Sequence, residues 1–206
     1  MLRIGAMVTL ARIAGAPELA GLTALQAAAA EVGNPNVRLR GTLGANLGYR
    51  APYPNLPPAL IALDATAVIA DAGGERTIAV EELVRTGPPP GALIVRIEIA
   101  GDAARSAFRK FAWRRSSGRT PVAVGGTRAR PRVVVGGLCR HAVRLPGVEA
   151  LLADRAWTPD LVREAAARAA GEAPADVAAF PPAIYRRRLV AAGVRRALDE
   201  LAGGRP

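Results

Sequence analysis

The sequence contains very little of several residue types, and each scarcity narrows what the protein can be. A single cysteine, Cys139, cannot form a disulfide within the chain, and no secretory leader is evident, so we expect a cytoplasmic protein. One cysteine and one histidine, His141, cannot complete a tetrahedral zinc site. Aromatic residues make up only 4% of the chain, too few for base-stacking platforms, so we predict no nucleic-acid partner. Apolar runs are too short to span a membrane.

Negative charge is scarce as well. The chain has 28 Lys and Arg against 17 Asp and Glu, a net charge of +11, and Lys110 is its only lysine. Arginine-rich surfaces bind phosphates, nucleic acids and acidic proteins alike, so charge alone does not choose the partner. Half of the residues are hydrophobic and 22% are charged, so the chain can bury a core.

The hydrophobic pattern predicts an α+β fold. Strands are expected over Leu2–Val8, Ala65–Ala70, Arg76–Val80, Leu93–Ile99, Ala104–Arg115, Pro121–Val124 and Arg132–Val135. Helices are expected over Leu22–Val32, Pro57–Asp64, Val148–Ala153, Pro159–Ala170 and Pro182–Leu201. Thr9 and Thr158 are placed to cap helices, and Gly73-Gly74 is typical of a hairpin turn.

A change of pattern after Gly101 predicts two domains. Residues 1–102 would form an antiparallel sheet with helices, interrupted by the stiff segment Gly87–Gly91. Residues 103–206 would form a three-stranded antiparallel sheet packed on a helical C-terminal bundle.

The segment Asn34–Pro58 carries the clearest chemistry, in its centre Gly41–Asn46. Glycines free the backbone to adopt positive φ, so that successive N–H groups can converge on an anion. The hydroxyl of Thr42 and the amide of Asn46 can add hydrogen bonds to phosphate or ribityl oxygens. The same composition is also typical of an ordinary tight turn, so the residues alone leave both interpretations open.

This segment resembles the second flavin motif of the FAD-binding subunit of molybdenum hydroxylases, the family of xanthine dehydrogenase and aerobic carbon monoxide dehydrogenase. The family pattern is I/V-R-N-x-G-T-x-G-G-N, then a Pro, an Asp and another Pro. The matching residues here are Val37, Arg38, Gly41, Thr42, Leu43, Gly44 and Asn46. Three positions depart from the pattern, because Leu39 replaces the Asn, Ala45 the second Gly, and Asn55 the Asp.

Four further blocks are similar to the family in the same order. Leu2–Thr9 resembles its L-x-I-G-A-x-x-T entry, and Pro58–Ala65 resembles its P-x-L-x-A-L-x-A helix. Lys110 and Arg114 fit a K-x-x-x-R strand, on which both side chains share one face. Tyr185-Arg186 with Leu189 fits the Y-R-x-x-L of the terminal helix.

The resemblance implies an oxidoreductase subunit that binds FAD and transfers electrons. It would receive them from an iron–sulfur small subunit and work beside a molybdopterin large subunit. The cofactor-binding residues that the resemblance implies are Thr42, Leu43, Gly44, Ala45, Asn46, Asn55 and Lys110. Lys110 would stabilise negative charge on the reduced flavin, although an exposed sheet lysine is the ordinary alternative.

The family also has an N-terminal subdomain with a first flavin loop of A-G-G-T type. This sequence starts at the L-x-I-G-A strand, so we expect half of the FAD-binding site to be missing and the chain alone to bind FAD weakly or not at all. The alternative function is a truncated, flavin-free homologue that serves as a subunit-interaction module or a basic binding protein.

Overall fold

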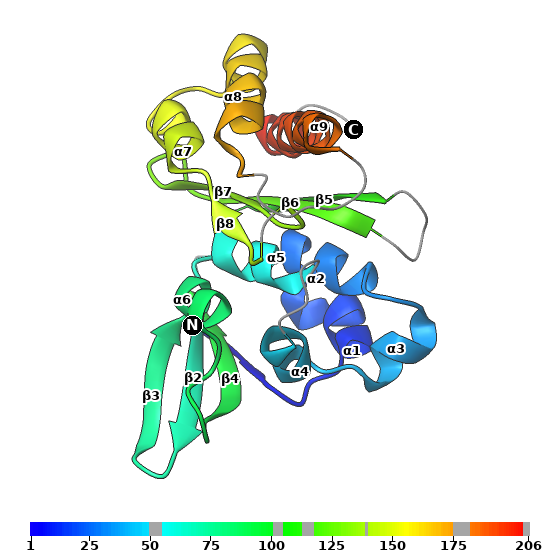
Figure 1. Cartoon of the computed structure of the whole chain (residues 1–206), viewed down its shortest axis with the longest axis vertical. Coiled ribbons are helices and arrows are strands. Elements are labelled where there is room, and N and C mark those ends of the chain that lie inside the picture. The colour runs from blue at the N-terminus through cyan, green and yellow to red at the C-terminus, as the bar shows by residue number, and fades with distance from the viewer. Residues whose placement is uncertain (50–54, 101–104, 113–117, 139, 175–181, 204–206) are drawn as a thin grey trace.

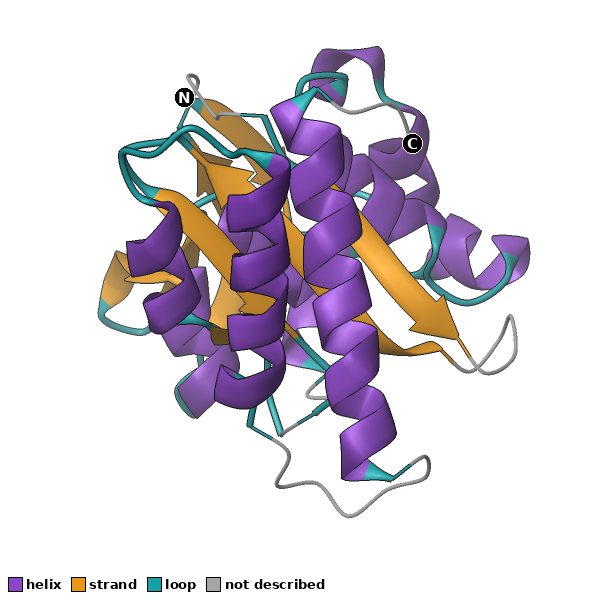
Figure 2. Cartoon of the chain, turned by 90° about the horizontal axis from the view of Figure 1, so that it is seen from above, coloured by secondary structure: helices purple, strands orange, loops and turns teal. Residues whose placement is uncertain are grey.

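The computed structural model describes residues 1–49, 55–100, 105–112, 118–138, 140–174 and 182–203. Within these residues the chain forms two antiparallel sheets of four strands each. Figures 1 and 2 show helices packed between the sheets and over the outer face of the second sheet. The predicted α+β class is therefore confirmed. No helix of the described residues is long and apolar enough to cross a membrane.

The first sheet has the strand order β1-β4-β2-β3. Its strands are β1 (Leu2–Gly5), β2 (Thr66–Asp71), β3 (Gly74–Ala79) and β4 (Leu93–Ile99). The predicted hairpin between β2 and β3 is confirmed, with Ala72 and Gly73 in its turn. Gly74 is the first residue of β3 and adopts a φ of 105°, which glycine tolerates without strain. The inner face of this sheet contributes apolar side chains to the first hydrophobic core, which it shares with the helices of the first half; they include Ile4, Ile97 and Ile99.

Short helices connect and flank the strands of the first sheet. They are α1 (Leu10–Gly15), α2 (Thr23–Ala30), α3 (Pro35–Arg40), α4 (Leu43–Gly48), α5 (Leu56–Ala62) and α6 (Val80–Thr86), with a 3-10 turn at Pro17–Leu19. Thr9 caps α1 as expected, because its hydroxyl accepts a hydrogen bond from the Arg12 N–H at 3.3 Å. Helices α3, α4 and α6 were not predicted.

The second sheet has the order β5-β6-β7-β8. Its strands are β5 (Ala107–Ala112), β6 (Gly118–Gly126), β7 (Pro131–Val135) and β8 (Val143–Arg144). The three predicted strands are confirmed where the structure describes them; residues 113–117, which include Arg114, lie outside the described residues. The short strand β8 was not predicted.

Three helices cover the outer face of the second sheet: α7 (Pro146–Leu152), α8 (Pro159–Glu172) and α9 (Ala183–Ala202). Helices α8 and α9 lie side by side along it (Figure 2). Thr158 caps α8 as predicted, although the helix continues past Gly171. The Glu172 carboxylate then accepts hydrogen bonds from the Gly147 and Val148 N–H groups, at 2.8 and 3.0 Å, and so caps α7 from a neighbouring helix.

The second sheet is buried on both faces. Val122, Val124, Val133 and Val135 face α7–α9, while the alternate residues face α2 and α5, because side chains on a strand alternate between faces. The alternate residues that join the first core are Phe108, Ala123 and Val134. The two halves of the chain thus share this sheet, and the predicted division at residue 102 stays a prediction about domains.

Polar contacts also join the two halves. Ser106 accepts from Thr23 through its carbonyl and from the Ala24 N–H through its hydroxyl. Arg132 pairs with Asp64, and Arg144 pairs with Glu81 across 3.7 Å. These contacts fix how the first half sits beneath the second sheet.

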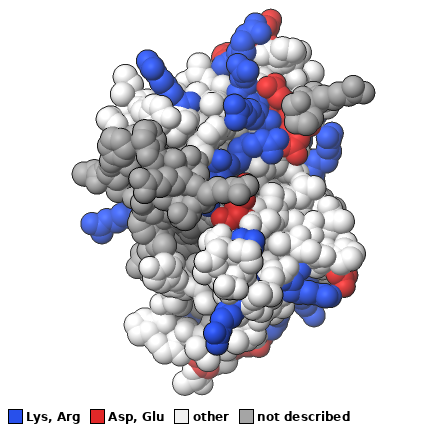
Figure 3. Space-filling model, turned by 90° about the vertical axis from the view of Figure 1, so that its right-hand side faces the viewer, with Lys and Arg blue, Asp and Glu red and all other residues white. Residues whose placement is uncertain are grey.

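The arginine-rich composition is accommodated at the surface. Figure 3 shows basic side chains gathered over the upper part of one side of the molecule, with acidic side chains among them. Several arginines of the chain are paired along helices, as Arg195 is with Asp199 at 3.8 Å and Arg163 is with Asp160. Exposed pairs of this kind contribute little stability each, so they mainly keep the surface polar.

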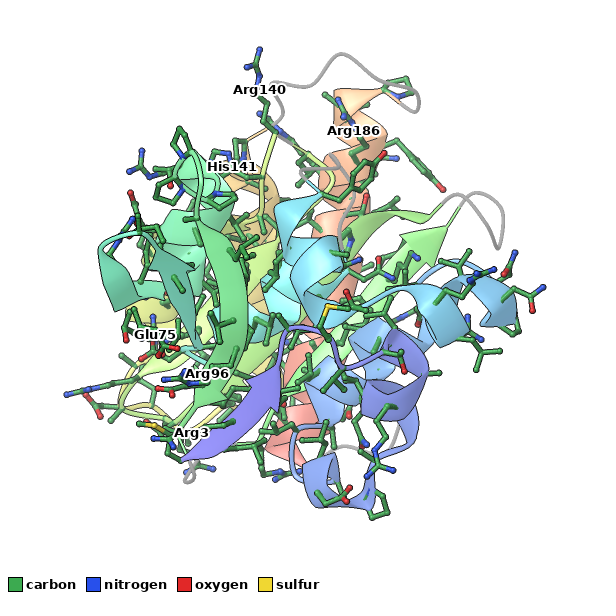
Figure 4. All side chains as sticks on the ribbon, turned by 90° about the horizontal axis from the view of Figure 1, so that it is seen from below. Arg3, Glu75, Arg96, Arg140, His141 and Arg186 are labelled. Atoms are coloured by element: carbon green, nitrogen blue, oxygen red, sulfur yellow. The ribbon has the colours of Figure 1, made fainter. Side chains whose placement is uncertain are left out.

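A row of alternating charges crosses the outer face of the first sheet (Figure 4). Glu98 on β4 lies 3.2 Å from Arg3 of β1 and 3.0 Å from Arg96, and Arg96 in turn lies 2.8 Å from Glu75 of β3. Opposite charges on facing strands support this pairing register. The row keeps this face polar, and the apolar face is turned to the core.

We expect Gly125→Ala to destabilise the protein, because a Cβ at Gly125 would lie only 2.6 Å from the carbonyl oxygen of Ala62 in α5. Backbone cannot move away cheaply, so the free energy of unfolding should fall by about 1–3 kcal/mol. The matched control is Gly171→Ala in α8, where a Cβ meets nothing within 4 Å and a better helix former should raise stability slightly. Urea unfolding of both variants measures this, and equal effects would contradict the close packing of α5 on β6.

Candidate functional site

The predicted flavin segment Thr42–Asn46 forms the start of α4, not an open loop. Thr42 caps this helix, because its hydroxyl accepts from the Ala45 N–H at 3.3 Å. Just before it, Asn34 caps α3 in the same way and Pro35 occupies the first turn. Two capping residues eight positions apart favour two short helices here. The glycine-rich composition of the segment predicts a turn instead.

The expected mode of anion binding is wrong for this segment. Gly41 has a φ of −67°, and Gly44 does not have a positive φ either. The N–H groups of Leu43 and Gly44 donate to the Val8 and Ala6 carbonyls at 2.9 and 2.8 Å. With the Ala45 N–H bound by Thr42, the first amides of α4 are already used, so the segment can offer a ligand its side chains rather than converging amides.

Gly44 is required by close packing. A Cβ there would lie 2.8 Å from the Ala6 Cβ and 3.2 Å from the Ala6 carbonyl oxygen. The helix start therefore sits directly on the residues that follow β1, and a bridge between Thr9 and Thr42 continues the contact. Ala6 and Val8 therefore anchor this segment, although no motif in the sequence predicted their role.

Asn46 carries the most informative polar atom of the segment. Its side-chain oxygen is buried and accepts no hydrogen bond from the described residues. A buried acceptor without a donor costs about 1–3 kcal/mol, and native proteins rarely leave one unsatisfied. A ligand with hydroxyl or ring N–H donors, such as the ribityl chain and ring of a flavin, satisfies this requirement, so the residues present fit FAD.

The other residues of the segment differ in exposure. Leu43 is buried in the first core, Thr42 is half-buried, and Ala45 is exposed. Large apolar side chains close to the segment in sequence remain exposed to solvent: Met7, Val37, Leu39 and Tyr49. The segment thus combines polar groups with accessible apolar surface, as small-molecule sites do.

Asn55 lies apart from these contacts, at the start of α5. It is 4% exposed, and its side-chain amide donates to the Ala28 carbonyl of α2 at 3.4 Å. This bond holds α5 against α2. The residues that connect it to α4, 50–54, lie outside the described residues.

Lys110 is placed at the end of α2. Its ammonium donates to the Glu31 carbonyl at 2.9 Å, where a cation is favoured by the helix dipole. Burial lowers the pKa of Lys110, and the Glu31 carboxylate partly opposes this. Burial raises the pKa of Glu31, against the pull of Lys110 and Arg109. Among the described residues, no hydrogen bond or ion pair links Lys110 to Thr42–Asn46.

His141 lies elsewhere, in a hollow of about 420 Å³ between α6 and β8 that Glu81, Arg85 and Arg144 also line. Figure 4 shows it near Arg140, away from the charge row of the first sheet. Cys139 lies outside the described residues, and the residues described hold no cluster of three potential metal ligands.

Two family models match this chain, one over each half. Residues 1–100 match the FAD binding domain in molybdopterin dehydrogenase, and residues 119–201 match the CO dehydrogenase flavoprotein C-terminal domain. The nicotine 6-hydroxylase medium subunit of Paenarthrobacter nicotinovorans is 30% identical over 219 residues, covering 98% of this chain and 75% of that protein. The chain belongs to the FAD-binding medium subunits of the molybdenum hydroxylase family.

Two further proteins are similar over nearly the whole chain. The 6-hydroxypseudooxynicotine dehydrogenase complex subunit alpha of Paenarthrobacter nicotinovorans is 28% identical, covering 95% of this chain and 71% of that protein. Quinoline 2-oxidoreductase from Pseudomonas putida 86 has a chain with a TM-score of 0.87 and 25% identity, covering 98% of this chain and 75% of that one. The resemblance inferred from the motifs is therefore confirmed for the family, the flavin cofactor and the class of oxidoreductase subunit.

We expect Gly44→Ala to lower the free energy of unfolding by about 1–3 kcal/mol, because its methyl group would overlap Ala6. Gly48→Ala is the matched control in the same helix, since a Cβ there meets nothing within 4 Å. Chemical denaturation of the two variants distinguishes a packing glycine from a flexible one. Unchanged stability of Gly44→Ala would show that α4 does not rest on β1 as described.

Proposed function

We propose that this medium subunit binds FAD at the segment Thr42–Asn46 and passes electrons from iron–sulfur clusters through the flavin to an acceptor. The observation that carries the proposal is the buried oxygen of Asn46, unsatisfied among the described residues, in the segment that resembles the flavin motif and within the part of the chain that matches the FAD binding domain. Bound FAD would supply the redox chemistry, and the protein would supply binding, orientation and electrostatics.

Side chains rather than backbone amides would hold the cofactor. Asn46 would accept a hydrogen bond from a flavin donor, and the Thr42 hydroxyl can donate while it accepts from the Ala45 N–H. The exposed side chains of Met7 and Leu39 offer apolar surface nearby in sequence, against which an aromatic ring system can pack.

Asn55 and Lys110 are proposed to serve the same site. Their contacts support a positioning role, because Asn55 holds α5 on α2 and Lys110 holds β5 on the end of α2. The lowered pKa of Lys110 follows from its burial at this junction. Both residues would therefore act through α2, to which each of them is bonded.

The partners would be an iron–sulfur small subunit and a molybdopterin large subunit. The names of the relatives, a medium subunit and a subunit of a dehydrogenase complex, support an assembly of several chains. Exposed arginines along α9, Arg187, Arg188, Arg195 and Arg196, would suit an acidic surface on one of them.

One observation favours the alternative of a flavin-free interaction module. The first N–H groups of α4 are engaged within the protein, so the segment has no backbone amide site for a pyrophosphate. The family motif has Gly and Asp where this chain has Ala45 and Asn55, and these replacements also favour the flavin-free module.

Titration of FAD into the purified chain, followed by flavin fluorescence, separates the two functions. We expect saturable though weak binding by the wild type and about tenfold weaker binding by Asn46→Ala, the loss that one buried hydrogen bond represents. Asn36→Ala is the matched control, because Asn36 is exposed on α3. Equal affinity of all three proteins would remove Asn46 from the site, and a wild type that never binds FAD would favour the flavin-free module.

A further inference from the structure

A second hollow lies far along the chain from the flavin segment, at one end of the second sheet. It has a volume of about 230 Å³ and opens where β6 turns into β7, beside the last turn of α9 and the connection between α7 and α8. Arg105, Thr127, Arg128, Trp157 and Leu201 are among the residues that line it. None of these residues belongs to the flavin motif.

The hollow carries unneutralised positive charge. Among the described residues, neither Arg105 nor Arg128 forms an ion pair with a carboxylate, although many other arginines of this chain do. The nearby carboxylate of Glu200 is paired with Arg109. Arg105 donates one hydrogen bond, at 3.4 Å, to the Glu200 carbonyl, so its other N–H groups remain available.

The opposite wall is apolar and fixed in place. The half-buried indole of Trp157 donates from Nε1 to the Leu152 carbonyl at 3.2 Å, which sets the orientation of its ring. Trp157 and Leu201 both pack against the second core. An aromatic face held in this way offers contact area at little entropic cost.

The basic side of the hollow is also braced. The Asp154 N–H donates to the Arg128 carbonyl at 2.9 Å, which ties the β6–β7 turn to the connection between α7 and α8. Within the turn, the Thr127 hydroxyl and carbonyl both accept from the Arg130 N–H at 3.1 Å. A braced backbone next to a fixed ring means that little ordering is required when a ligand binds.

We propose that this hollow binds a small organic anion, a carboxylate attached to an apolar group. The carboxylate pairs with Arg128 and Arg105, because guanidinium groups bind carboxylates through parallel hydrogen bonds. The apolar group lies against Trp157 and Leu201. The volume suits one ring or one branched side chain and is too small for a dinucleotide, so the ligand is a free aromatic acid or the C-terminal residue of a protein chain.

The test follows the indole N–H signal of Trp157 in the full-length chain by NMR, identified by its loss in Trp157→Phe. The probes are benzoate for a free aromatic acid and N-acetyl-leucine for a chain terminus, with N-acetyl-leucinamide as the uncharged control. We expect at least one of the carboxylates, but not the amide, to shift the signal saturably. Arg128→Gln and Arg105→Gln should each weaken binding by about tenfold.

The matched control is Arg130→Gln, which removes the same charge two residues from Arg128 but outside this hollow. Its affinity should stay within about twofold of the wild type, because a general electrostatic effect of one exposed charge is small and screened. Equal weakening by all three arginine variants would overturn the proposal. So would a shift that sodium chloride at equal ionic strength reproduces, or identical shifts with the amide.

Discussion

The close approach of helix α5 to strand β6 is the constraint on which the rest of the structure depends. A Cβ on Gly125 would lie 2.6 Å from the Ala62 carbonyl oxygen, so no side chain fits there, and a Cβ on Gly136 would lie 2.9 Å from Pro121 and 3.2 Å from Pro58. This contact buries the inner face of the second sheet under the first half of the chain, while α7–α9 bury its outer face. The sheet is therefore a shared layer, and neither half has a complete core without it.

The flavin segment inherits its position from this arrangement. Helix α5 and the second sheet hold α2 in place, and the side chains of Asn55 and Lys110 are hydrogen-bonded to α2 and its C-terminal end. Helix α4 is attached to the residues that follow β1, because its first N–H groups donate to the Ala6 and Val8 carbonyls. The amides of α4 are used for this attachment, so the chemistry left for a cofactor belongs to side chains. The side-chain oxygen of Asn46, which is buried and unsatisfied among the described residues, is the clearest example of a side-chain group left for a ligand.

The sequence predicted features whose cause is local and missed those whose cause is distant. The caps at Thr9 and Thr158 were correct, and so was the hairpin between β2 and β3, although its turn lies one residue earlier than predicted. Each of these features depends on residues within a few positions. Helices α3 and α4 were missed because Gly33 and Gly41 on either side of α3, and Gly44 within α4, indicate a turn, whereas Gly44 is set by contact with Ala6. The partner of Lys110 lies 79 residues away, and no local pattern could identify it. The family motif located the flavin segment but did not reveal how its backbone is bonded.

Differential scanning calorimetry of the wild-type chain tests the shared layer most directly. For a single cooperative unit, the calorimetric enthalpy of unfolding equals the van't Hoff enthalpy. We predict one transition that meets this equality, and we expect Gly125→Ala to shift the whole transition to lower temperature. Two resolved transitions, with only one of them moved by Gly125→Ala, would contradict the account, because residues 1–102 and 103–206 would then hold separate cores.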